Sequence, residues 1–168
     1  MNKNTLIIKD GIKTLVDLRE YITDVVIPDG ITEIGYKAFE NCTLLTEITI
    51  PDSVTKIGKF AFFKCSSLAS ITIPDGVTKI DDWAFNGCSS LKEIVIPNSV
   101  EFIGDSAFCS CTSLTKITIP ASLTKICDWA FDGCLSLESI YIDQEKDSLD
   151  LRYAEIPKTT KVYWRGEF

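Results

Sequence analysis

The chain contains short stretches in which apolar and polar residues alternate. In residues 68–73 the first, fourth and sixth positions are apolar, whereas Ser70 and Thr72 are polar. A period of two is typical of a strand with one buried face. The Pro-Asp-Gly sequence of residues 74–76 then favours a tight turn, because it combines a fixed φ angle, a side chain that bonds the local backbone and a flexible residue. We therefore expect a short strand followed by a turn.

The apolar spacing changes beyond this turn. Val77 and Ile80 are expected to point back into the core. Asp82 is placed to cap a short helical turn, because the next apolar residues fall at helical spacing: Ala84, Phe85, Cys88 and Leu91. Each unit is therefore predicted to contain a strand, a turn and a helical turn.

The unit recurs every 23 residues without insertion, as the Ile-Pro dipeptides at 27–28, 50–51, 73–74, 96–97 and 119–120 show. The same frame holds Phe39, Phe62, Phe85, Phe108 and Phe131, then Cys42, Cys65, Cys88, Cys111 and Cys134. A fixed period of roughly 20 to 50 residues indicates a solenoid. One unit cannot bury its apolar residues alone, whereas parallel strands stacked about 4.8 Å apart bury them in one continuous core.

The pattern L-x-x-I-x-I-P-x-x-V-x-x-I-G-x-x-A-F-x-x-C resembles the BspA-type leucine-rich repeat, with five 23-residue copies over residues 22–142. The resemblance implies a single domain over residues 1–168 of the α/β repeat class. It would be a right-handed leucine-rich-repeat solenoid with a parallel β-sheet on one face and short helical turns on the other.

The two flanks keep the repeat frame poorly and are expected to be caps. Residues 1–21 are expected to form an N-terminal cap with a partial repeat. At this end of the chain, degraded repeat positions are held by Leu15, Val16, Ile22, Val25 and Ile27. Residues 143–168 are expected to form the C-terminal cap. In that cap, residues 162–164 are predicted to add a last strand of uncertain register.

Composition excludes several classes of function. With 17 basic and 24 acidic residues the net charge is −7, so we expect no nucleic-acid partner. The chain has no histidine, which removes Ser-His-Asp and Cys-His catalysis and histidine metal sites. No phosphate-binding glycine motif occurs. We expect no enzyme activity, no cofactor and no metal.

The N-terminal apolar run, residues 6–8, is too short for a signal peptide or a spanning helix. It predicts no membrane insertion. The sequence as written predicts a cytoplasmic protein, with display at the cell surface or secretion as the alternative if the chain is truncated.

Three further columns of equivalent residues have two interpretations each. The cysteine column is predicted to be buried thiols rather than metal ligands or a disulfide ladder, while Cys109 and Cys127 fall at outward or variable positions and are expected to be exposed. A calcium site or simple turn formation explains Asp29, Asp52, Asp75 and Asn98, and we favour turns.

The aromatic column contains Phe60, Trp83 and Trp129, with Phe63 and Phe102 nearby. We favour packing between repeats over an exposed apolar patch. Because an exposed patch would promote self-association, we expect a monomer.

The outward positions of successive strands line up as one row. Its residues are the predicted partner-binding site: Glu47, Thr49, Ser70, Thr72, Glu93, Val95, Lys116, Thr118, Ser139 and Tyr141. Solenoids bind protein ligands through such rows, although plain solvation explains the row as well. The resemblance implies a non-catalytic protein-binding or adhesion module. An intracellular scaffold and a structural spacer are the alternatives.

Overall fold

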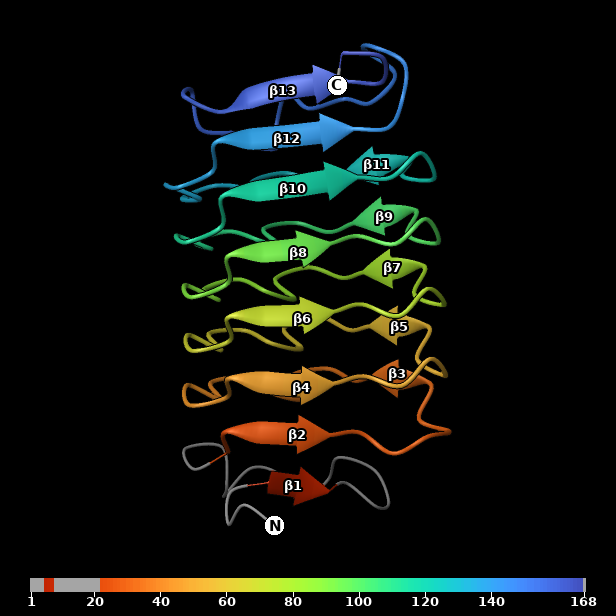
Figure 1. Cartoon of the computed structure of the whole chain (residues 1–168), viewed down its shortest axis with the longest axis vertical. Helices are drawn as coiled ribbons and strands as arrows, with labels where there is room; N and C mark the ends of the chain where they lie inside the picture. Colours follow the sequence, from red (N-terminus) through yellow and green to blue (C-terminus); the bar gives the residue numbers. More distant parts are fainter. Residues whose placement is uncertain (1–4, 8–21, 168) are drawn as a thin grey trace.

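The computed structural model describes residues 5–7 and 22–167 and forms a parallel β-solenoid with two rows of strands (Figure 1). The first row contains β1 (Thr5–Ile7), β2 (Asp24–Val26), β4 (Glu47–Thr49), β6 (Ser70–Thr72), β8 (Glu93–Val95), β10 (Lys116–Ile119), β12 (Ser139–Ile142) and β13 (Lys161–Trp164). The second row contains β3 (Glu33–Ile34), β5 (Lys56–Ile57), β7 (Lys79–Ile80), β9 (Phe102–Ile103) and β11 (Lys125–Ile126). Strands of the second row point opposite to those of the first (Figure 1).

The parallel pairing follows the repeat of the sequence. The first row is divided into a three-stranded sheet, β1-β2-β4, and a five-stranded sheet, β13-β12-β10-β8-β6, and the second row is one five-stranded sheet. Ser70 lies opposite Glu93 and Lys116 opposite Ser139, so neighbouring rungs are aligned without a shift. The parallel sheet predicted from the sequence is confirmed, whereas the handedness of the solenoid stays a prediction.

The turn predicted at the end of each strand is confirmed. At the turn of residues 74–76, the N–H of Val77 donates to the carbonyl oxygen of Pro74 at 3.1 Å. The equivalent bonds in the other rungs start from Ile31, Val54, Val100 and Leu123. Asp75 is exposed within this turn, and among the described residues no cluster of three or more His, Cys, Asp or Glu side chains is placed to hold a metal ion.

The expectation of helical turns on the second face is wrong. Among the described residues the chain forms no helix. Trp83 and Gly87 have φ angles of 60° and 76°, which interrupt the right-handed backbone that a helix needs. The N–H groups of Trp83, Phe85 and Gly87 instead donate to carbonyl oxygens of the next rung, at 2.8 Å each. This segment is a series of turns bonded from rung to rung.

Asp82, which was expected to cap the helical turn, links three rungs instead. Its Oδ1 accepts a hydrogen bond from the N–H of Asp105 at 3.0 Å, and its Oδ2 lies 3.1 Å from the ammonium group of Lys59. The left-handed positions also recur in the same frame, at Lys37, Phe60, Ser106 and Trp129 and at Asn41, Lys64, Ser110 and Gly133. The local conformation is therefore a property of the repeat.

A column of phenylalanine rings runs through the core. Phe39, Phe62, Phe85, Phe108 and Phe131 are fully buried. Neighbouring rings are stacked with centroids 5.1 to 6.0 Å apart and nearly parallel planes. Aromatic rings in offset stacks gain attraction beyond the area that they bury. The stack joins the rungs along the solenoid axis, so no rung is stable without its neighbours.

Both flanks continue the solenoid where the structure describes them. β13 pairs with β12 in parallel register, which confirms the last strand predicted at residues 162–164. This rung is offset by 22 residues instead of 23, because Tyr141 lies opposite Tyr163. At the other end β1 pairs with β2, and Ile22, Val25 and Ile27 are buried. Leu15 and Val16 lie outside the described residues.

Candidate protein-binding surface

The outward side chains of the first row form a continuous surface, which we call the strand face. Seven of its ten predicted residues are exposed: Glu47, Thr49, Ser70, Thr72, Glu93, Val95 and Lys116. Thr118, Ser139 and Tyr141 are half-buried. Val95 exposes 72% of its surface at the middle of the face. The strand register therefore aligns all ten predicted residues along the first row of strands.

Charged groups on the strand face are in none of the ion pairs between described residues. Those pairs join Lys37 to Glu40, Lys56 to Glu33, Lys59 to Asp82, Lys79 to Asp81, Arg152 to Asp150 and Arg165 to Asp143. None of them involves Glu47, Glu93, Lys116 or Lys161. Glu93 and Lys116 lie opposite each other in neighbouring strands, so the face carries both signs of charge.

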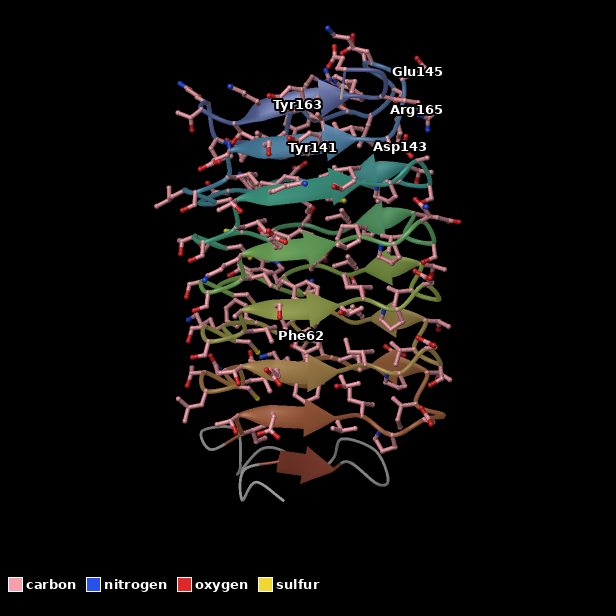
Figure 2. All side chains as sticks on the ribbon, in the orientation of Figure 1. Phe62, Tyr141, Asp143, Glu145, Tyr163 and Arg165 are labelled. Atoms are coloured by element: carbon pink, nitrogen blue, oxygen red, sulfur yellow. The ribbon has the colours of Figure 1, made fainter. Side chains whose placement is uncertain are left out.

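Two tyrosines gather at the C-terminal end of the strand face. The rings of Tyr141 and Tyr163 are stacked with centroids 5.1 Å apart, and the ammonium group of Lys116 lies 5.0 Å from the centroid of Tyr141 (Figure 2). Such a cation above an aromatic face is attracted by the ring quadrupole. Lysine and two tyrosines from three successive rungs thus form one ordered column.

An open depression of about 600 Å³ lies beside this column. It is lined by Leu135, Ser136, Leu137, Glu138, Ser139, Tyr141, Thr159, Lys161 and Tyr163. Sequence reasoning had assigned Ser139 and Tyr141 to the binding row but missed Leu135, Lys161 and Tyr163. The one signal available for Tyr163 was its place in the expected last strand, and the 22-residue offset of that rung hid its alignment with Tyr141.

The aromatic column on another side of the solenoid is mainly packed between rungs. Phe60 and Trp83 are half-buried and stacked with centroids 5.8 Å apart, and Phe63 contacts both rings. Phe102 is also half-buried. Trp129 differs because 54% of its surface is exposed. The aromatic side chains of this column are therefore packed between rungs, except for the exposed Trp129.

The five cysteines of the column are packed in the core. All seven lie in the described residues, and none forms a disulfide. Burial raises the pKa of the Cys88 and Cys111 thiols well above its ordinary range, and it raises the pKa of Cys134 to about 12. Since the thiolate is the nucleophile and metal ligand, these groups are chemically quiet near neutral pH.

The two cysteines outside the column differ from each other. Cys109 is half-buried, and its Sγ lies 3.8 Å from Oδ2 of Asp132. Cys127 was expected to be exposed, and this is wrong, because only 6% of its surface is accessible. Burial also raises the pKa of its thiol. Cys127 occupies the position of Gly104 one rung earlier, where the chain packs closely against the preceding rung.

The described residues contain no helix long and apolar enough to cross a membrane.

Comparison with known proteins agrees with the repeat and its geometry. The family model described as the BspA type leucine rich repeat region matches in six copies, over residues 18–138 and 85–155. Among curated proteins, no significant match is found. Solved structures with the same fold are bacterial leucine-rich-repeat proteins.

A leucine-rich repeat protein of T. pallidum is 32% identical, with a TM-score of 0.70 over 84% of this chain and 73% of that one. The pneumococcal vaccine antigen PcpA is 25% identical, with a TM-score of 0.76 over 84% of this chain and 36% of that one. A leucine-rich repeat protein of Bacteroides ovatus is 31% identical, with a TM-score of 0.57 over 86% of this chain and 46% of that one. This chain therefore spans less than half the length of the last two proteins. By its repeat, its strand register and these matches, the chain belongs to the BspA-type leucine-rich repeat family.

Proposed function

We propose that the protein is a non-catalytic binding module that presents the strand face to a protein partner. Leucine-rich repeat proteins are generally protein-interaction modules and are typically non-catalytic. The observation that carries the proposal is the aligned row of outward side chains on parallel strands, most of them exposed. Among its charged members, Glu47, Glu93 and Lys161 are in no ion pair between described residues. The module is proposed to act as a monomer, with its strand face open to solvent.

Site-specific photo-crosslinking tests this proposal. A crosslinking amino acid replaces Thr72, which is exposed on β6, and in a control protein it replaces Lys125, which is exposed on β11 of the second row. We expect one protein of the source cells to crosslink from position 72 and not from position 125. Equal crosslinking from both rows, or none from either, would contradict the proposal and leave a spacer role.

Adhesion is the form of this function that we favour, with an intracellular scaffold as the alternative. The support for adhesion is the likeness to a pneumococcal protein that is named a vaccine antigen. Protease treatment of intact source cells separates the two. Loss of the chain from intact cells supports adhesion, and survival until lysis supports the scaffold.

A further inference from the structure

The C-terminal end of the strand face differs from the rest of it in shape. Along the earlier strands the face alternates short side chains such as Thr49, Ser70 and Thr72 with the charged residues Glu47, Glu93 and Lys116. At β12 and β13 the stacked rings of Tyr141 and Tyr163 form one side of the open depression of about 600 Å³. Concave sites favour binding because they remove more of a ligand from water than a flat surface does.

The tyrosine pair is suited to act as an anchor for a partner. Each ring has few rotatable bonds, and stacking at 5.1 Å with Lys116 above Tyr141 fixes both rings before binding. Tyrosine therefore contributes large contact area at low cost in conformational entropy, and it is enriched among the residues that dominate binding energy. Because the two rings already contact each other, a partner that binds them needs little rearrangement of the pair.

An exposed apolar residue completes the depression. Leu135 lines it and exposes 77% of its surface, the largest fraction of any large apolar residue described. The equivalent positions in earlier rungs are polar: Thr43, Ser66, Ser89 and Thr112. Burying a leucine side chain is worth about 1.5–3 kcal/mol when it leaves water completely. The depression thus offers apolar contact at a repeat position that is polar in the earlier rungs.

Lysines contribute positive charge at the depression and its edge. The lining itself contains one lysine, Lys161, and one glutamate, Glu138. At the edge, the ammonium group of Lys116 lies above Tyr141, and Lys158 is exposed next to the lining residue Thr159 in the sequence. The lysines of this group thus outnumber Glu138, although the chain has a net charge of −7. Electrostatic complementarity favours an anionic partner segment.

From this combination we infer that the depression at β12 and β13 binds an acidic, extended polypeptide segment of the partner and takes up an apolar side chain from it. The carboxylates of that segment pair with Lys161 and Lys116, and its apolar side chain contacts Leu135 and the tyrosine rings. The inference rests on the proposed function and names which end of the strand face anchors the partner.

Titration of the isotope-labelled full chain, followed by amide chemical shifts, tests the inference. The probes are a short peptide in which Asp alternates with Leu, the same peptide with Lys in place of Asp, and inorganic phosphate. We expect the acidic peptide to shift amides of Ser139–Ile142 and Lys161–Trp164, and the basic peptide to leave them unchanged. Shifts caused equally by phosphate would mean simple anion binding and would overturn the inference, as would shifts that map to the second row.

Matched variants separate charge from apolar contact. Lys161→Glu should weaken binding of the acidic peptide roughly fivefold, the upper range of one exposed ion pair, and Leu135→Ser should weaken it as well. Both residues are exposed, so the fold should be retained. Lys125→Glu makes the same charge change on the second row and should have no effect. Unchanged binding in Lys161→Glu and Leu135→Ser would overturn the inference.

The same variants distinguish this inference from the proposed function. If position 72 still crosslinks to its partner in the Lys161→Glu and Leu135→Ser proteins with undiminished yield, the strand face binds the partner without this anchor. The inference then fails while the proposed function stands. If no partner crosslinks from the strand face at all, the proposed function itself fails.

Discussion

The Sγ of Cys88 donates a hydrogen bond to the backbone carbonyl oxygen of Phe62, 3.2 Å away in the preceding rung. The same bond recurs from Cys65 to Phe39, from Cys111 to Phe85 and from Cys134 to Phe108, at 3.1 to 3.3 Å. Each thiol therefore fills a small buried space and gives a second hydrogen bond to a carbonyl group that already accepts one from the backbone, as Phe62 does from the N–H of Cys65 at 3.1 Å. The thiol thus has a hydrogen-bond partner although it is buried.

Thiol labelling should follow this arrangement. In the native protein at neutral pH, a thiol reagent should leave Cys88 and Cys111 unmodified, because both are fully buried and burial raises the pKa of each thiol. Cys109 is half-buried and should react first. Mass spectrometry of timed reactions, with denatured protein as the control, measures the order. Labelling of Cys88 as fast as Cys109 in native protein contradicts the burial described here.

Alkaline pH should weaken the fold through the same thiols. The pKa of Cys134 is raised from its ordinary value of 9.0 to about 12, so in the window between these values the unfolded chain loses this proton and the folded chain keeps it. The stabilisation is complete below pH 9 and is lost as the pH rises toward 12. Each such thiol lowers the free energy of unfolding by about 1.4 kcal/mol per pH unit.

Urea titrations between pH 8 and 11 measure this effect. The Cys134→Ala protein is the control, because it lacks one of the ionising thiols. Its stability should fall less steeply with pH than that of the original chain. Parallel curves for the two proteins are the outcome that would refute the assignment.

Truncating a side chain of the phenylalanine column should lower the free energy of unfolding far more than truncating one on the strand face. Phe85 is fully buried between two stacked rings, so Phe85→Ala should lower the free energy of unfolding by about 3 to 5 kcal/mol. Thr72 is exposed, and Thr72→Ala should change stability by less than about 0.5 kcal/mol. Chemical denaturation measures both, and similar losses would mean that the two faces are wrongly assigned.

Gly104 should not tolerate a side chain, because it packs closely against the preceding rung. A Cβ atom on Gly104 would lie 2.5 Å from the backbone nitrogen of Asp82. We expect Gly104→Ala to lower the free energy of unfolding by about 1 to 3 kcal/mol, the range of overpacked sites. Thermal unfolding measures this loss, with the exposed-site variant Thr72→Ala as the control. A neutral Gly104→Ala protein would show that the rungs are not this close.

The sequence predicted the strands and the core because their determinants are repeated. Residues such as Ile71 and Ile73 alternate with polar neighbours, and the 23-residue interval fixes which of them meet. The prediction of a helical turn was wrong, although Ala84, Phe85, Cys88 and Leu91 have helical spacing. These residues are buried, but the backbone that carries them forms a series of turns and not a helix. That conformation depends on a positive φ at Trp83, which is rare for a bulky residue and leaves no mark in the sequence.

The candidate site was predicted only as far as the repeat extends. The ten strand-face residues follow from the period of two, and the structure places them on one side. Tyr163 and Leu135 were missed for different reasons. Tyr163 lies in a rung that is one residue shorter, and Leu135 stands at a turn position that is polar in the earlier rungs. The binding depression is built from such departures from the repeat, which a periodic pattern cannot reveal.

Glu167 bonds the backbone of β13, which lies at one end of its five-stranded sheet. In the rung of β2, the N–H of Ile27 donates to the carbonyl oxygen of Thr49 in the next rung. Trp164 holds the equivalent position in β13, and its N–H donates to Oε2 of Glu167 at 2.9 Å, while the N–H of Glu167 donates back to the carbonyl oxygen of Trp164 at 2.9 Å. The carboxylate thus takes the part that a carbonyl oxygen of the next rung takes for Ile27. Open strand edges promote pairing with other chains.

Replacing Glu167 with Ala should expose the N–H of Trp164 and favour association through β13. Sedimentation velocity over a range of protein concentrations measures this, with Glu167→Gln as the matched control, because its amide oxygen still accepts a hydrogen bond. We expect Glu167→Ala to self-associate at concentrations where the original chain and Glu167→Gln do not. If all three proteins sediment alike, the carboxylate closes a local turn only and does not protect the edge.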